Sequence, residues 1–131
     1  MTAYPLTTLA TVLALIVLTA LSAIVSRARG RYAVPAPATT GHPEFERRYR
    51  VHANTVEQIV MLIPLLWLTA AWIGDPWAGL AGLVWCLGRV LYARGYFKEA
   101  GRREIGYYVT VVPVLAMMVA VVVAVAARWS A

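Results

Sequence analysis

The segment FERRYRVHANTVEQIVMLIPLLWLTAAWI, residues 45–73, sets the architecture of this chain. From Ile59 to Ile73 it carries no charge, yet at about 1.5 Å per residue this stretch covers only about 22 Å of a hydrocarbon layer about 30 Å thick. A helix that crosses the layer must therefore draw Glu57, and with it Asn54, to the edge of the hydrocarbon or inside it. Polar groups at that depth are costly, so they mark a candidate functional site.

The composition around this segment is that of a membrane protein. The 131 residues are 61% hydrophobic and 14% charged, whereas soluble domains have about 45–50% apolar and about 25% charged residues. This composition excludes soluble enzyme folds, and it excludes disordered chains, which have low hydrophobicity. The single cysteine, Cys86, excludes a disulfide framework and a cysteine zinc site. We expect no metal site, because the two histidines have no partner at ligand spacing.

Four apolar runs predict an all-α, integral membrane four-helix bundle that forms a single domain over residues 1–131. The expected spans cover residues 6–25, 52–73, 77–96 and 107–127. Basic residues cluster at 27–31, 47–50 and 94–103, and the positive-inside rule places these clusters in the cytosol and both termini outside. We assign the net charge of +6 to topology and anionic lipid head groups, not to nucleic acid. The short, Ala- and Arg-rich chain indicates a bacterial inner membrane.

Polar side chains form two stripes at membrane depth. On the second span, Arg50, Asn54 and Glu57 follow one another at spacings of four and three, so they share one helical face. The third span carries another stripe if its glycines do not break the helix, namely Arg89, Tyr92, Tyr96 and Arg103. Two such stripes lie where a membrane helix tolerates polar groups least.

The turn at residues 74–76 is so short that spans two and three should pack as an antiparallel hairpin. Counting outward from that turn places Asn54 level with Tyr96. Arg89 lies deeper, and its side chain is long enough to reach back toward Glu57. The arrangement has two interpretations, a ligand site or a structural ion pair between Glu57 and Arg89 that holds the two helices together.

As a ligand site, the stripes suit a small zwitterionic peptide with more carboxylates than amines. Guanidinium groups pair with carboxylates in two-point contacts, Glu57 can accept an ammonium group, and Asn54 can recognise a peptide bond. Glutathione has this composition and adds a thiol. An arginine near the thiol would stabilise the thiolate, which is the nucleophilic form. An apolar second substrate would then enter from the bilayer.

Two blocks of sequence in these spans form a signature. The first is Phe45-Glu46-Arg47-Arg48-Tyr49-Arg50, followed by His52, Asn54 and Glu57. The second is Arg89, Tyr92, Gly95-Tyr96 and Arg103. Together they resemble the MAPEG family, the membrane-associated proteins of eicosanoid and glutathione metabolism, and the resemblance covers the whole chain. The chain departs from the leukotriene-forming branch at His52, where that branch has glutamine, and at Gln58, where it has tyrosine.

The resemblance implies a homotrimer of four-helix bundles with glutathione bound between neighbouring subunits at the cytosolic side. The positions that match glutathione contacts are Arg50, Asn54, Glu57, Tyr92 and Tyr96. Arg29 and His52 match positions that contribute from the adjacent subunit, and Arg103 matches the arginine that activates the thiol.

These expectations favour a membrane-bound glutathione transferase that conjugates hydrophobic electrophiles and also acts as a glutathione peroxidase on lipid hydroperoxides. One alternative is a non-catalytic lipid-binding membrane protein of the same fold. Another is an exporter of cationic drugs, which needs a carboxylate near the centre of a span. The first span has none, and Glu57 lies toward one edge of its own span.

Overall fold

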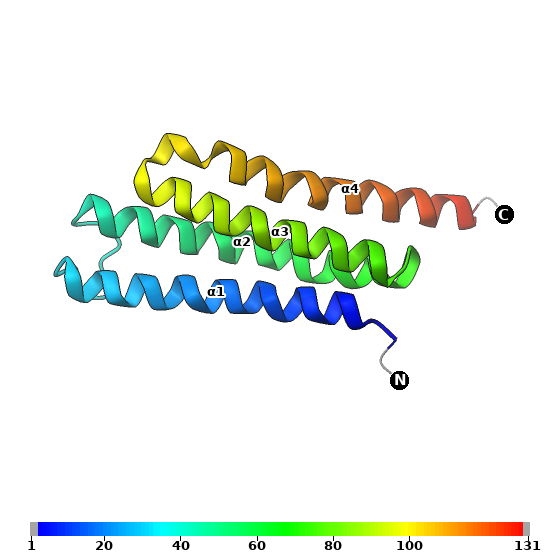
Figure 1. Ribbon diagram of the computed structural model, residues 1–131, viewed down its shortest axis with the longest axis horizontal. Coiled ribbons are helices and arrows are strands. Elements are labelled where there is room, and N and C mark those ends of the chain that lie inside the picture. Colours follow the sequence, from blue (N-terminus) through cyan, green and yellow to red (C-terminus); the bar gives the residue numbers. More distant parts are fainter. Residues whose placement is uncertain (1–2, 130–131) are drawn as a thin grey trace.

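The apolar runs fold as four long helices that lie alongside one another (Figure 1). The computed structural model describes residues 3–129. In chain order the elements are α1 (Pro5–Arg31), α2 (Pro43–Trp72), α3 (Asp75–Lys98), the 3₁₀ helix η1 (Ala100–Arg103) and α4 (Glu104–Trp129). The predicted all-α bundle is confirmed. Each helix begins before the span predicted for it, and α1, α3 and α4 also end beyond it, because the helical backbone continues past the apolar run into the flanking residues.

The central element of the bundle is α3, which contacts α1, α2 and α4, whereas α1 and α4 lie on opposite sides (Figure 1). Within the described residues, α1, α2 and the segment Ala100–Trp129 are long and apolar enough to cross a membrane. At 24 residues α3 is about 36 Å long. It is less apolar because Arg89 interrupts its hydrophobic stretch. The assignment of residues 77–96 as a fourth span stays a prediction.

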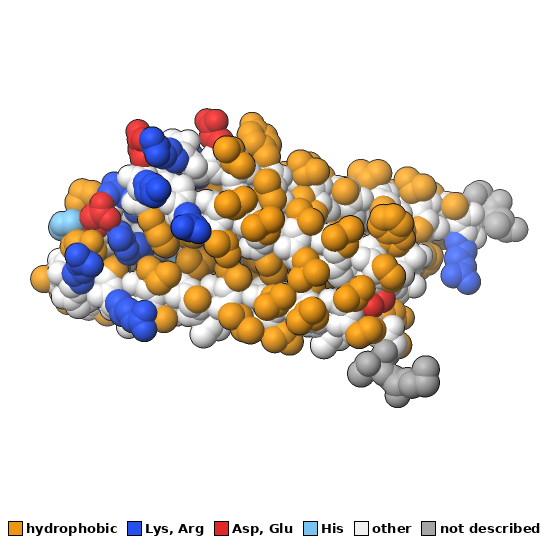
Figure 2. Space-filling model, in the orientation of Figure 1, with side chains coloured by type: hydrophobic (Ala, Val, Ile, Leu, Met, Phe, Trp, Pro, Cys, Tyr) orange, Lys and Arg blue, Asp and Glu red, His pale blue; other side chains and the backbone are white. Residues whose placement is uncertain are grey.

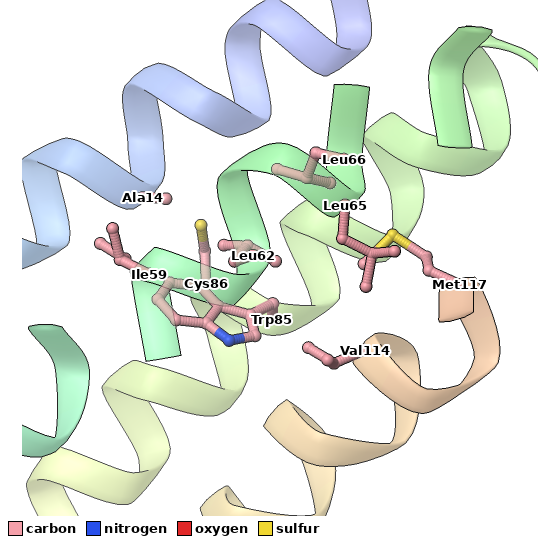
Figure 3. Close-up of a cluster of buried hydrophobic side chains, with 9 residues drawn as sticks. All are labelled: Ala14, Ile59, Leu62, Leu65, Leu66, Trp85, Cys86, Val114 and Met117. Atoms are coloured by element: carbon pink, nitrogen blue, oxygen red, sulfur yellow. The ribbon is translucent and has the colours of Figure 1, made fainter. Parts of the chain in front are cut away.

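Side chains from all four helices meet in a buried apolar cluster in the middle of the bundle (Figure 3). Its members are Ala14, Ile59, Leu62, Leu65, Leu66, Trp85, Cys86, Val114 and Met117. Trp85 is fully buried and fills the space between the helices. The Cys86 side chain lies among hydrocarbon groups, where a thiol behaves as a small apolar side chain. This packing fixes the relative positions of the helices that carry the polar stripes.

Asp75 connects the start of α3 to the start of α1. Its carboxylate accepts hydrogen bonds from the backbone N–H groups of Leu6 and Thr7, at 3.0 and 2.8 Å. The α1 N-cap residue, Tyr4, supplies no side-chain cap of its own. Because the first N–H groups of a helix have no partner within it, the Asp75 carboxylate caps α1 from a neighbouring helix.

The polar stripe of α3 ends earlier than the sequence predicted. The helix passes Gly95 without a break but stops at Lys98, and Arg103 belongs to η1. The backbone carbonyl of Arg102 lies so close to Gly95 that a Cβ atom there would collide with it. The prediction of one continuous stripe from Arg89 to Arg103 is therefore wrong, because the chain turns after Lys98 and folds back onto α3.

Candidate functional site

Lys and Arg side chains gather at the end of the bundle where α1 ends and α2 begins, while the flank of the bundle is covered with hydrophobic side chains (Figure 2). The same end holds the connection from α3 to α4 (Figure 1). The start of α1 and the end of α4 lie at the opposite end (Figure 1). This distribution agrees with the predicted arrangement, in which both long connections share one side of the membrane. We call this end the basic end.

A groove of about 410 Å³ opens at the basic end, between the connection that precedes α2, the first turns of α2, and the end of α3. Its lining residues are Thr39, Thr40, Pro43, Glu46, Arg47, Tyr49, Arg50, Tyr96 and Ala100. Two predicted site residues, Arg50 and Tyr96, therefore meet here. Arg50 is exposed, and the structure gives it no ion pair within residues 3–129. Its guanidinium is available to an anionic ligand.

Tyr92, Tyr96 and Arg103 form a second part of the site. The rings of Tyr92 and Tyr96 lie with their centroids 5.6 Å apart, and both side chains are buried. The guanidinium carbon of Arg103 lies 5.2 Å from the centroid of the Tyr96 ring. The fold-back of η1 brings this exposed arginine over the ring, so the predicted association of Arg103 with the tyrosines holds although the predicted helix does not.

Arg89 has a different partner from the one predicted. It is 1% exposed, and its Nη2 group donates a hydrogen bond of 2.8 Å to the hydroxyl oxygen of Thr55. Its guanidinium carbon also lies 4.1 Å from the centroid of the Tyr92 ring. Thr55 is on the face of α2 that is buried against the bundle, whereas Glu57 is exposed. The predicted reach of Arg89 toward Glu57, and with it a structural ion pair inside one chain, is wrong.

The remaining residues of the α2 stripe lie beside the groove and do not line it. The Asn54 amide donates to the Glu57 carboxylate at 3.5 Å, which is a long contact. Glu57 is exposed, and Asn54 and His52 are half-buried. The structure therefore brings Arg50, Tyr96 and Arg103 together but leaves Asn54 and Glu57 facing outward on the surface of a single chain.

Comparison with known proteins matches residues 7–123 to the model of the MAPEG family. The chain belongs to the MAPEG family. The resemblance seen in the two sequence blocks is confirmed, and the helical bundle is an integral membrane protein.

Several proteins are similar to this MAPEG chain. An uncharacterized protein of Synechocystis sp. is 48% identical over 83 residues, which cover 63% of this chain and 61% of that protein. Human microsomal glutathione S-transferase 2 is 41% identical over 83 residues, which cover 63% of this chain and 56% of that enzyme. Bovine leukotriene C4 synthase is 38% identical over 76 residues, which cover 58% and 51% of the respective chains. The matched region thus spans between half and about three fifths of these relatives.

Arg29 has a structural role within the MAPEG chain itself. Its Nη1 group donates to the backbone carbonyls of Val34 and Ala38, at 3.4 and 2.7 Å, and its guanidinium carbon lies 4.8 Å from the centroid of the Phe45 ring. Arg29 thus holds the connection between α1 and α2 against the start of α2. Its expected contact with glutathione in an adjacent subunit stays a prediction, as does that of His52.

Sequence reasoning missed part of the groove wall. Thr39 and Thr40 line the groove from the connection before α2, whereas in the sequence they only resembled the leukotriene-forming branch of the family and were not assigned to the site. Sequence reasoning assigned Arg50 of the first block to the site, but it did not predict the ion pairs of the other two arginines of that block. Arg47 and Arg48 both pair with Glu44, the latter at 2.6 Å. These spacings of three and four are those of ion pairs on one helical face, and they would have distinguished these paired arginines from Arg50.

Proposed function

We propose that this MAPEG protein is a membrane-bound glutathione transferase that conjugates the glutathione thiolate to hydrophobic electrophiles and also reduces lipid hydroperoxides with glutathione. The observation that carries the proposal is the convergence of two guanidinium groups on Tyr96. Arg50 lines the same groove as Tyr96, and Arg103 lies over its ring. Arg103 itself lines a neighbouring pocket with Tyr107 and Tyr108, and a site that includes both guanidinium groups suits a tripeptide that has two carboxylates and a thiol.

The site has to lower the pKa of the glutathione thiol, and this requires only a modest free energy. A free thiol has a pKa of about 8.5, and a shift of two units requires about 2.7 kcal/mol. One cation placed beside the sulfur in a half-buried site can supply that amount. We assign this role to Arg103 and assign the carboxylates of glutathione to Arg50. The thiol proton leaves to water, the sulfur attacks the electrophilic carbon, and the leaving group departs with the electron pair of the broken bond.

We further propose that the site is completed between chains of a homotrimer in a bacterial inner membrane, with glutathione entering from the cytosol. In support, Glu57 is exposed and Asn54 and His52 are half-buried on the single chain, and a span that crosses the hydrocarbon layer would place them at its edge, where polar groups are costly. Tyr92 is buried behind this surface. A neighbouring chain and a bound peptide would give the exposed groups partners.

Conjugation of glutathione to a chlorinated nitroaromatic acceptor by the purified protein tests the proposal. We expect a rate above the uncatalysed reaction, together with heat of glutathione binding in calorimetry. Arg103→Ala should abolish the ultraviolet absorption of bound thiolate while most of the binding remains. Arg128→Ala, which removes an exposed arginine near the end of α4, is the matched control and should change neither.

Background rates with several acceptors and hydroperoxides, combined with no heat of glutathione binding, would favour the non-catalytic lipid-binding alternative. Such a protein has no need to bind the tripeptide. An unchanged thiolate signal in Arg103→Ala would refute the assignment of Arg103 while leaving the transferase activity in place.

A further inference from the structure

We propose that the groove between α1 and α3 binds one anionic phospholipid, with an acyl chain along the groove and the phosphate on Arg94 and Arg27. The groove has a volume of about 250 Å³. Its walls include Ile16, Ala20 and Ile24 on α1, and Val90, Ala93 and Phe97 on α3. Arg89, which is buried and donates to Thr55, also lines it. This groove is separate from the groove at the basic end, which is lined by the connection before α2, the first turns of α2, and the end of α3.

Differences in side-chain size along the two helices explain why a groove forms there. Near the start of α1, a Cβ atom on Gly82 would lie 2.7 Å from the Cβ of Ala10, and one on Gly79 would collide with Leu6. The two backbones are therefore in close contact at that end. Toward the basic end, the small side chains of Ala20 and Ala93 lie among the larger residues that line the groove and leave space between them. The space between them is apolar and long enough for part of an acyl chain.

Arg94 supplies the first positive charge at the mouth of the groove. It lines the groove and is exposed, and no ion pair or hydrogen bond is found for it in the described part of the chain. Because Ala10 lies against Gly82 in two parallel helices, Arg94 lies about level with Ser22. A guanidinium at this depth extends along the apolar surface toward the membrane–water interface. The Arg94 guanidinium would therefore lie where the phosphate of a lipid lies when its acyl chain occupies the groove.

Arg27 supplies the second charge. It follows Ile24 by three residues and so lies on the same face of α1, one turn closer to the basic end. It too is exposed, with no ion pair among residues 3–129. Two other arginines of this end are paired, Arg48 with Glu44 and Arg102 with Glu99. Two unpaired guanidiniums at the head of an apolar groove complement a phosphate joined to an acyl chain, and anionic lipids occur in the cytoplasmic leaflet.

Native mass spectrometry of the purified protein in detergent can test this site. The protein is titrated separately with phosphatidylglycerol and with phosphatidylcholine that have identical acyl chains. Each arginine near the surface contributes about fivefold to the affinity for an anionic lipid. We expect Arg94→Gln and Arg27→Gln each to weaken phosphatidylglycerol binding about fivefold, and the double variant about 25-fold. Arg94→Lys should retain most of the preference, and Arg128→Gln should retain all of it.

The apolar half of the site is tested by Ala20→Phe, which places a ring in the groove without changing the charge. The matched control is Ala23→Phe, an exposed position of α1 that does not line the groove. Ala20→Phe should remove the tightly bound phosphatidylglycerol, and Ala23→Phe should retain it. Equal binding by the two variants, or an unchanged lipid preference in the double arginine variant, would overturn the proposal. Disulfide cross-linking of Ala20→Cys between chains in a Cys86→Ala background would overturn it too, because a second copy would then cover the groove.

Discussion

Replacement of Gly106 by alanine tests whether the contact between α3 and α4 positions the candidate site. Gly106 is buried in the first turns of α4. A Cβ atom there would lie 2.8 Å from the carbonyl carbon of Leu91 and would collide with the backbone of Tyr92. Carbon atoms normally approach to about 3.5 Å. A backbone cannot rotate out of the way as a side chain can, so α4 must retreat from α3.

The expected magnitude is the difference between two opposing effects. Overpacking costs about 1–3 kcal/mol, and a collision with backbone belongs at the upper end. Alanine gains about 1 kcal/mol over glycine in a helix interior. The net loss for Gly106→Ala is therefore about 2 kcal/mol. Gly30→Ala is the matched control, because Gly30 is helical and, apart from its chain neighbours and its own helix backbone, no described atom lies within 4 Å of an added Cβ. It should be neutral or slightly stabilising.

Unfolding of the detergent-solubilised protein, followed by circular dichroism, measures the stability difference. Calorimetry measures glutathione affinity in the same samples. Arg103 precedes Gly106 by only three residues. Movement of α4 away from α3 should therefore also move the Arg103 guanidinium away from Tyr96 and weaken glutathione binding. If Gly106→Ala matches Gly30→Ala in stability and wild type in affinity, the close packing of α4 on α3 does not position the site.

Further substitutions test other contacts. Arg50→Ala removes a charged hydrogen-bonding group from the groove and should weaken glutathione binding about 10- to 100-fold in calorimetry. Thr55→Val leaves the buried Arg89 without its acceptor and should cost about 1.5–3 kcal/mol of unfolding free energy, whereas Arg89→Met should be close to neutral, since it removes a buried charge that pairs with no carboxylate. Asp75→Asn should lower the unfolding temperature at neutral pH. Partial burial opposes the shift, but the N–H groups of Thr7 and Leu6 hold the pKa of Asp75 below its usual value, so its contribution is lost as pH falls through that lowered pKa. A wild-type unfolding temperature that equals that of Asp75→Asn at neutral pH would contradict this.

The helices were predictable because each one needs only a long apolar run, and such runs are visible in the sequence. The end of α3 was not, because it depends on a tertiary contact between Arg102 and Gly95. The partner of Arg89 was not predictable for a related reason. At the depth of Arg89, both Glu57 and Thr55 were possible partners for its side chain. The rotation of α2 about its own axis decides between them, because it places Thr55 on the buried face. Sequence spacing gives depth and shared face, but it does not show which way that face points.

The pairing of arginines separates structural from ligand-binding cations more clearly than their positions do. Arg29 binds carbonyl groups of a connection, Arg48 binds Glu44, and Arg89 binds Thr55. Each of these already has its partner within the fold. Arg50 and Arg94 lie in separate grooves, and within the described residues neither has an ion pair. Where such a groove arginine has no carboxylate partner in the chain, we expect the anionic group of a ligand to pair with it. On this reasoning, the two grooves should bind two different anions, a water-soluble peptide at Arg50 and a lipid at Arg94, and a substitution in one groove should leave binding in the other unchanged.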